Sequence, residues 1–488
     1  MIAKRLDRTT EKMGQETFHR LTGRLSGNVL QEQTQPPGRP IDRFAEIRDK
    51  IGLLGLLLFA FFAWLGTTVA HLALLGLALM LLAEGPSAWK VLSRDPFVRL
   101  FAVFFVYLLV RIVWASMQWP ETSREQWASL WPWTSLWSFF VVAWWLKGRW
   151  NRVWAVMICA PLGLMGGIIR RGDWHQFSHW LAGERYEFGY TSLGLSFLAL
   201  AIVLGLLSFL PRIAFAAKGA GYRIAVVLLT LGVQFFFLFV LMVAQSRGAW
   251  LSLLFGLLLF VILAVVSREA ASANRMLRAH PLVLPFFVCT AFVLAASIFF
   301  REAIVARFAS EMAILPDLLS MGMEKVPYSS GWSRIHLTVW GARMFSQHPF
   351  FGWGPGFKAT LYLADEGFRG AHGGFLSVIR HFTHLHNVYL EILVRFGLLG
   401  TLIFVSGFVI FVRSIIDNRR SGILPWDFFV FVQVILFTTL FLGFYEFRVL
   451  HTDFRFFALL FGGVVYTFAL HGDPHRESGA CPTAAPDG

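Results

Sequence analysis

The sequence is poor in charged residues for its length. Only 15% of its 488 residues are Asp, Glu, Lys or Arg, whereas 56% are hydrophobic. A soluble globular protein carries about 25% charged residues, so the composition excludes an ordinary soluble domain. Acidic residues are fewer than basic ones, since the sequence has 29 Asp and Glu and 43 Lys and Arg. The basic residues gather in short stretches between apolar runs, which is typical of membrane topology signals and does not indicate a nucleic-acid partner.

Cysteine is also scarce. Cys159 and Cys289 lie within apolar runs and Cys481 lies near the C-terminus. Since no two of the three form a Cys-x-x-Cys pair, no disulfide framework is expected. The first 50 residues contain no apolar stretch, so a cleaved signal peptide is not expected and the first apolar run should act as the insertion signal.

Long apolar runs are what the sequence has in abundance. About twelve are long enough to cross about 30 Å of hydrocarbon. They lie at 51–68, 70–86, 98–116, 129–147, 151–169, 187–210, 222–244, 249–267, 281–300, 387–413, 425–446 and 453–470. We therefore predict an all-α polytopic membrane protein with about twelve transmembrane helices.

The basic residues predict how these helices are oriented in the membrane. With the N-terminus in the cytoplasm, every connection predicted on the inside is basic, including 90–99, 147–152 and 413–420. The prediction divides the chain into a cytoplasmic tail (1–50), helices 1–9 (51–300), one large outer segment with amphipathic helices (301–386), helices 10–12 (387–470) and a cytoplasmic C-terminal tail (471–488).

Arg247 is an ionisable residue that the inside rule does not explain. It lies between two apolar runs with almost no loop, where a charged side chain usually faces a cavity or a partner. Gly248, the next residue, would allow a tight turn and a close approach of a ligand to the backbone. The alternative is an interfacial arginine that snorkels to lipid headgroups.

A second candidate lies in the outer segment, where 331–345 has the pattern of an amphipathic helix. Its apolar residues recur at spacings of four and three, at Ile335, Val339, Ala342 and Phe345. Ser333 is expected as the N-cap, which would put Arg334 in the first turn. An arginine there opposes the helix dipole, and an anionic ligand held by Arg334 and the free backbone N–H groups would account for it. The alternative is a helix that lies on anionic lipid.

The third candidate is His384-Leu385-His386-Asn387, at the foot of the run 387–413. Imidazole exchanges protons near neutral pH, so a neutral histidine here could take a proton from a sugar hydroxyl. Asn387 is expected to orient the ring by a hydrogen bond. A metal site is an alternative, because His-x-His can donate two ligands, although no clear third ligand lies nearby in the sequence. A structural, helix-capping role is the other.

These motifs together resemble the O-antigen ligase / Wzy-type polymerase superfamily. The resemblance rests on Ser246-Arg247-Gly248-Ala249, Arg334 with His348-Pro349 and Gly352-x-Gly354, and His384-x-His386-Asn387-x-Tyr389-Leu390 with Gly397-Leu398-Leu399-Gly400. In motif terms it covers about residues 240–405, and the helix plan with one large outer loop extends it over nearly the whole chain.

The resemblance implies a glycosyltransferase with a membrane fold of the C type, acting at the periplasmic face of a bacterial inner membrane. It implies metal-independent, inverting transfer of a glycan from undecaprenyl diphosphate to a lipid A–core sugar, with no cofactor. By motif position it assigns the diphosphate to Arg247 and Arg334 and the general base to His386, which is preferred over His384 because it directly precedes Asn387. The candidate supporting residues are His384, Asn387, Arg111 and Arg171.

Other functions stay open at this point. A polymerase that extends the lipid-linked glycan would share the fold and the motifs, and we favour a ligase because one outer segment carries both Arg334 and the histidines. A protein O-oligosaccharyltransferase would be expected to carry an extra C-terminal domain. A transporter of lipid-linked precursors would show internal repeats and charges near mid-membrane. No clear repeat is present, and Arg111, Glu391 and Arg395 all lie toward the outer ends of their predicted helices.

Overall fold

The computed structural model describes residues 43–216, 219–269, 330–357 and 383–472, with a few further positions between 290 and 309. The chain divides into two compact units, Met1–Asp49 and Lys50–Gly488. The first contributes only the beginning of one helix to the described residues. All regular structure in the described ranges is helical and contains no strand, as predicted.

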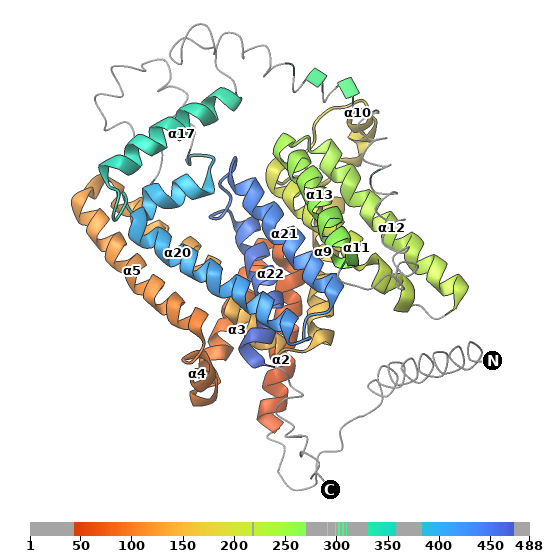
Figure 1. The fold of residues 1–488 in the computed structure, drawn as a ribbon, viewed down its shortest axis with the longest axis horizontal. Helices are drawn as coiled ribbons and strands as arrows, with labels where there is room; N and C mark the ends of the chain where they lie inside the picture. The colour runs from red at the N-terminus through yellow and green to blue at the C-terminus, as the bar shows by residue number, and fades with distance from the viewer. Residues whose placement is uncertain are drawn as a thin grey trace, which may run out of the picture. The chain divides into compact units, whose positions relative to one another are not determined.

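Within the described ranges the helices follow one another with short connections (Figure 1). Those before residue 270 are α2 (Arg43–Leu65), α3 (Thr67–Ala83), α4 (Pro86–Leu92), α5 (Pro96–Gln118), η1 (Pro120–Thr122), α6 (Ser123–Ala128), α7 (Leu130–Trp137), α8 (Phe139–Leu146), α9 (Trp150–Arg171), η2 (Trp174–Gln176), α10 (Phe177–Leu181), α11 (Ser192–Ala216), α12 (Ala220–Val243) and α13 (Arg247–Glu269). Those after residue 329 are α17 (Ser330–Gln347), α20 (Val388–Arg420), α21 (Trp426–Gly443) and α22 (Thr452–His471).

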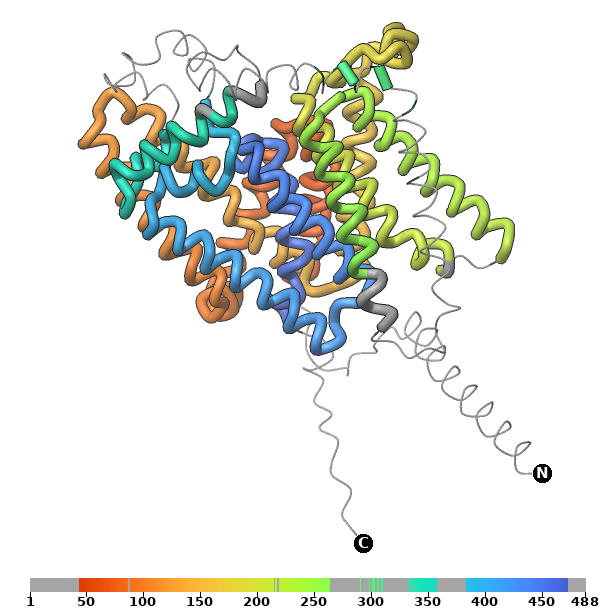
Figure 2. Tube along the Cα trace, turned by 45° about the horizontal axis from the view of Figure 1, so that its top comes forward, coloured from red at the N-terminus to blue at the C-terminus, as the bar shows by residue number. Residues whose placement is uncertain are grey.

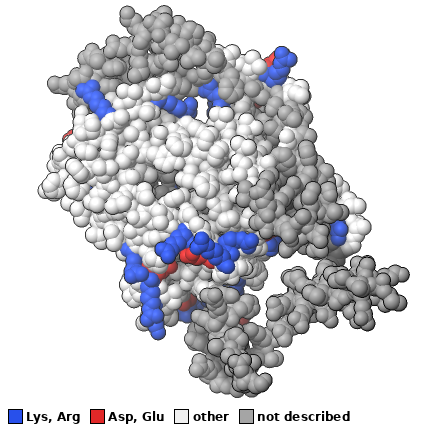
Figure 3. Space-filling view, viewed as in Figure 1, with Lys and Arg blue, Asp and Glu red and all other residues white. Residues whose placement is uncertain are grey.

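Seven of the described helices are long and apolar enough to cross a membrane, namely α5, α9, α11, α12, α20, α21 and α22. Helix α3 and the part of α13 over Arg247–Leu263 are apolar but shorter. Figure 3 shows a broad band without charged side chains, with Lys and Arg gathered below it and a few above. This is the surface that a lipid bilayer requires. The seven do not include helices for the predicted spans 51–68, 70–86, 129–147 and 249–267, and the predicted span 281–300 lies outside the described ranges, so the count of about twelve stays a prediction.

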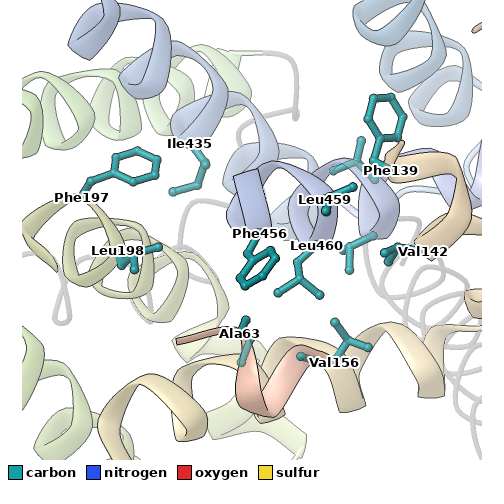
Figure 4. Close-up of a cluster of buried hydrophobic side chains, with 14 of the residues drawn as sticks. Ala63, Phe139, Val142, Val156, Phe197, Leu198, Ile435, Phe456, Leu459 and Leu460 are labelled. Atoms are coloured by element: carbon teal, nitrogen blue, oxygen red, sulfur yellow. The ribbon is translucent and has the colours of Figure 1, made fainter. Parts of the chain in front are cut away.

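Helix α22 lies at the centre of this bundle. Helix α8 packs along it, and α7, α9, α11 and α20 also contact it. In Figure 4, Phe456, Leu459 and Leu460 of α22 lie among side chains from five other helices, and all three are buried. A Cβ on Gly463 would lie 2.4 Å from the Val142 side chain, so a small residue is what lets α22 approach α8 closely.

Two predicted spans are interrupted. The run 129–147 forms α7 and α8, which separate at Ser138, where ψ is 16°. The Ser138 hydroxyl donates to the carbonyl oxygen of Thr134 at 2.7 Å, a bond that bends helices. The run 387–413 extends to Arg420 but breaks at Gly397, whose φ of 63° lies in the left-handed region that glycine tolerates.

The turn 348–357 fills the break in α20. The amide N–H of Leu398 donates to the backbone carbonyl of Pro349 at 2.8 Å, and the N–H of Gly354 donates to the backbone carbonyl of Arg395 at 2.9 Å. These bonds satisfy backbone groups that the broken helix leaves open, as membrane depth requires. The segment Val388–Phe396 is thereby held as a short helix of its own, beside α17 and at the same end of the bundle as the α21–α22 connection (Figures 1 and 2).

The helix predicted over 331–345 exists as α17, but two details of the prediction are wrong. Helix α17 begins at Ser330, so Ser333 is inside it rather than at its N-cap, and Arg334 is its fifth residue. The backbone N–H groups that lack intrahelical partners belong to the first four positions, so they do not explain Arg334. The buried face contains Leu337 and Met344, whereas Ile335 and Val339 of the predicted apolar stripe are 42% and 50% exposed.

Candidate active site

The connection between α21 and α22 places a carboxylate beside the predicted base. Oε2 of Glu446 lies 3.1 Å from Nδ1 of His386. Burial alone would raise the pKa of Glu446, but the hydrogen bond from His386, the charge interactions with His386 and His384 and, last, the charge of Arg334 hold this pKa below its usual range. The ionised carboxylate can accept a hydrogen bond from Nδ1 of His386, and in that tautomer of the neutral ring Nε2 is the accepting nitrogen.

His384 lies against the same ring. The ring centroids of His384 and His386 are 4.3 Å apart, and the ring of His451 is 5.9 Å from that of His384. Burial, followed by the charge of His386, lowers the pKa of His384 to about 3. Its Nδ1 is buried and has no hydrogen-bond partner among the described residues. His384 is therefore an uncharged ring near neutral pH, and its Nδ1 can still form a hydrogen bond.

The loop that carries the histidines is fixed at its C-terminal end by Asn387. His386 has a φ of 52°, which is unfavourable for a residue with a Cβ and needs support from its surroundings. Asn387 is the N-cap of α20, where Oδ1 accepts from the N–H of Leu390 at 3.0 Å and Nδ2 donates to the carbonyl of Phe444 at 3.1 Å. Asn387 was predicted to orient the base. In the structure it ties the histidine loop to the α21–α22 connection, and Glu446 orients the ring.

A buried ion pair supports the loop from the side of α20. Glu391 accepts from Nε of Arg395 at 2.7 Å through Oε1, and from the N–H of Leu385 at 2.7 Å through Oε2. Nη1 of Arg395 also donates to the carbonyl of Pro355 at 2.6 Å, and the guanidinium lies 5.3 Å from the centre of the Phe447 ring. Loss of either partner would leave a buried charge alone, so both members of the pair are needed. Through the hydrogen bond from Leu385 to Glu391, the pair fixes Leu385 between the two histidines.

Arg334 reaches this cluster, and the turn that carries Arg247 contacts the neighbouring Tyr445. Nη2 of Arg334 lies 3.9 Å from Oε2 of Glu446, and its Nε has no hydrogen-bond partner in the described part of the chain. Arg247 begins α13, and the carbonyl of the following Gly248 accepts from the hydroxyl of Tyr445 at 2.6 Å. A Cβ on Gly248 would lie 2.5 Å from the Tyr445 ring, so only glycine permits this contact.

The other two candidate arginines have partners elsewhere. Arg111 donates to the carbonyl of Gly352 at 2.8 Å and so braces the turn in the break of α20. Arg171 donates to the carbonyl of Leu65 at 3.1 Å, and its guanidinium lies 4.5 Å from the centre of the Tyr190 ring. These contacts give both arginines a structural role away from Glu446.

A cavity of about 460 Å³ opens beside His384. His384, Arg395 and His451 contribute to its lining, together with Glu125 of α6 and Ser129 just after the end of that helix. The volume falls in the range of about 300–1,000 Å³ that is typical of small-molecule sites.

The two histidines and Glu446 could also serve as metal ligands. One ligand atom of each lies within 4.8 Å of the others. The sequence showed no third ligand beside His384 and His386, and the structure supplies one from 60 positions further along the chain. Two imidazoles and a carboxylate form a zinc-type donor set. However, the guanidinium of Arg334, 3.9 Å from the same carboxylate oxygen, would repel a divalent cation and favours an anion here.

Comparison with known proteins places these residues in a family. Residues 232–405 match the family model of O-antigen ligase. The chain carries an O-antigen ligase family domain. The matched region contains Arg247, Arg334 and both histidines, and the predicted membership of the O-antigen ligase / Wzy-type polymerase superfamily is confirmed. Its enzymes are glycosyltransferase-like ligases and polymerases that use lipid-linked glycans. None of the curated proteins compared with the chain matches it.

Glu446 and His451 lie beyond the part of the chain that matches the O-antigen ligase family, and sequence reasoning missed both. Glu446 ends the predicted span 425–446. A carboxylate at the boundary of an apolar run is costly unless it has a partner, and this was the signal available in the sequence. Its pairing with His386 is a tertiary contact that no local pattern reports.

Proposed function

We propose that this protein is an O-antigen ligase that transfers a glycan from undecaprenyl diphosphate to a sugar hydroxyl of lipid A–core. The observation that carries the proposal is the contact of His386 with Glu446 at 3.1 Å, beside Arg334, at the O-antigen ligase family domain. An oriented base and a cation with unused donors are the two groups that such a transfer needs.

The donor side depends on the arginines. A glycosyl diphosphate is already a good leaving group, so the enzyme has to stabilise its growing negative charge and need not protonate it. Guanidinium groups match phosphate oxygens in geometry and charge. The side chain of Arg334 is 39% exposed and its Nε lacks a partner among the described residues, so donors remain for a phosphate. We assign the diphosphate to Arg334 and Arg247.

The acceptor side depends on His386. Its Nε2 takes the proton of the acceptor hydroxyl while that oxygen attacks the anomeric carbon of the donor. The bond from this carbon to the diphosphate oxygen breaks, and the diphosphate leaves with the electron pair from the opposite face, which inverts the anomeric centre. Glu446 stabilises the imidazolium that forms. His384, with a pKa of about 3, is too weak a base for this role.

The proposed location is a bacterial inner membrane, with the active site at the periplasmic face and both termini in the cytoplasm. Lys and Arg gather at the end of the bundle away from α17 (Figures 1 and 3), which supports this orientation by the positive-inside rule. Nucleotide sugars are not supplied to the periplasm, so a transfer at this face needs a pre-activated, lipid-linked donor. The segment 301–386 would then be the large periplasmic loop.

A transfer assay with the purified protein tests the proposal. The mixture contains undecaprenyl-diphosphate-linked glycan, lipid A–core and a chelator of divalent metals. We expect glycan on lipid A–core despite the chelator. Longer glycan that stays on the polyprenyl carrier would make the protein a polymerase with the same site. Transfer that requires added divalent metal would contradict the arginine mechanism, and movement of the donor across vesicles without transfer would make the protein a transporter.

A further inference from the structure

The cavity beside His384 is lined by residues other than the two arginines assigned to the diphosphate. Its described lining includes His384 and His451 but neither Arg334 nor Arg247. We propose that this cavity is the acceptor subsite and that it takes a neutral, phosphate-free sugar ring. This inference rests on the proposed ligase function and adds where the second substrate binds and of what kind it is.

The charge of the lining argues against an anionic ligand. Arg395 is the one permanent cation among the described lining residues, and each of its three nitrogens already donates to a partner. Nε and Nη2 bind the Glu391 carboxylate and Nη1 binds the carbonyl of Pro355. Glu125 contributes a carboxylate to the same cavity. Among the described lining residues, a diphosphate or a phosphorylated sugar would therefore meet no cation that lacks a partner.

The hydrogen-bonding groups suit a ligand rich in hydroxyls. The Ser129 hydroxyl donates to the carbonyl of Gln126 at 2.6 Å, which leaves its oxygen as an acceptor. Thr383 adds an exposed hydroxyl, and the buried Nδ1 of His384 is still without a partner among the described residues. The cavity thus combines a few polar groups with a partly apolar wall that includes Phe447. Small-molecule sites usually have this combination.

The position of the cavity agrees with the chemistry of inversion. His384 lines it, and the His384 ring lies 4.3 Å from the ring of His386. A hydroxyl at this end of the cavity is therefore next to the proposed base, while Arg334 lies on the Glu446 side of that base. The proposed acceptor and diphosphate sites are thus made by different residues and meet at the proposed base, as an in-line displacement with two substrates requires.

The test fills the cavity. Ala128 is an exposed residue of α6 that lines it, and Ala102 of α5 is exposed and does not. In Ala128→Phe, the KM for lipid A–core should rise about tenfold or more, a loss of about 1.4 kcal/mol, while the KM for the lipid-linked donor changes by less than about twofold. Ala102→Phe, the same change at a site away from the cavity, should leave both constants as in the wild type. Ala128→Leu should give an intermediate acceptor KM.

Binding measured without turnover separates this inference from the proposed function. Dephosphorylated core oligosaccharide should show saturation-transfer NMR signals with the wild-type protein and lose them with Ala128→Phe. If the wild type transfers glycan and the acceptor KM of Ala128→Phe is unchanged, the subsite is wrong and the ligase function stands. If the donor KM rises instead, the cavity holds the donor and the inference is overturned. If the wild type transfers nothing, the function fails and the oligosaccharide signals alone decide whether the cavity binds sugar.

Discussion

The protonation states of a few side chains determine the chemistry at the predicted outer face. Glu446 is ionised, His384 is neutral, and His386 lies between them with its Nδ1 on the carboxylate. This arrangement gives the two histidines different roles although they are two positions apart. One is the proposed base and the other is a neutral hydrogen-bonding group beside the cavity.

Replacing Glu446 tests the orientation of the base. In Glu446→Gln the side chain keeps its size but no longer stabilises an imidazolium at His386. We expect kcat to fall about 10²-fold or more, by analogy with other histidine bases that lose their carboxylate. The KM for lipid A–core should change little, because Glu446 does not line the acceptor cavity. Steady-state kinetics of the purified variant measure both, and an unchanged kcat would show that Glu446 is only structural.

The low pKa of His384 makes stability depend on pH. The unfolded chain binds a proton at this residue below its ordinary pKa of 6.5, whereas the folded protein does not until about 3. Stability from this group is thus present at neutral pH and is lost as pH falls. Between about pH 7.5 and pH 5 the loss should be about 2 kcal/mol. Thermal unfolding of wild type and His384→Gln at both pH values measures it, and an equal pH dependence in the two proteins would refute the low pKa.

Arg334 tests the donor side. Arg334→Ala should raise the barrier to transfer by about 2–5 kcal/mol, because the diphosphate then lacks a guanidinium partner. Arg343→Ala, an exposed arginine on the same helix α17, should transfer glycan at close to the wild-type rate. The comparison uses single-turnover rates at saturating lipid A–core. Equal losses in the two variants would mean that α17 contributes overall charge rather than a specific contact.

At the scale of elements, the broken helix α20 positions the site. The break at Gly397 frees Val388–Phe396 to carry Glu391, Arg395 and the capping Asn387 at an angle that the rest of α20 does not share. The turn 348–357 holds this short segment through backbone bonds. The histidine loop therefore depends on a kink some ten residues away from it.

Filling the kink should disturb the site without touching it. A Cβ on Gly397 would lie 2.4 Å from the backbone of Phe350, and its φ of 63° is unfavourable for alanine. Gly397→Ala should lose about 1–3 kcal/mol of stability and most of its transfer activity. Gly76→Ala is the control, because a Cβ there meets nothing within 4 Å. Thermal unfolding and transfer assays compare the two, and a Gly397→Ala protein with normal activity would contradict the role of the kink.

Helix α17 shows what periodicity can and cannot predict. Its apolar spacing correctly predicted a helix, but the stripe through Ile335 and Val339 is exposed and the one through Leu337 and Met344 is buried. In a membrane protein the outward face of a helix can be as apolar as the inward face, so hydropathy alone does not choose between two stripes. For the same reason, the interruptions of the two spans were not predicted: Ser138 and Gly397 break helices inside runs whose hydropathy is continuous.

On the scale of the whole molecule, composition and motif order could predict an all-helical membrane protein of the O-antigen ligase superfamily with Arg247, Arg334 and the histidines as its candidate residues. The contacts that complete the site could not be predicted. Glu446 reaches His386 across 60 positions, and the cavity joins α6 to the start of α22. These pairings depend on how helices pack around α22, and helix packing leaves little trace in the local sequence.

Transfer by a purified His386→Ala protein tests the central claim most directly. His175, an exposed histidine in η2, gives a matched control as His175→Ala. Both variants are purified, shown to unfold at the wild-type temperature, and supplied with undecaprenyl-diphosphate-linked glycan and lipid A–core. We predict that His175→Ala transfers glycan as the wild type does and that His386→Ala is slower by about 10²–10⁴-fold. Wild-type transfer by a folded His386→Ala protein would contradict the proposed base and with it the mechanism.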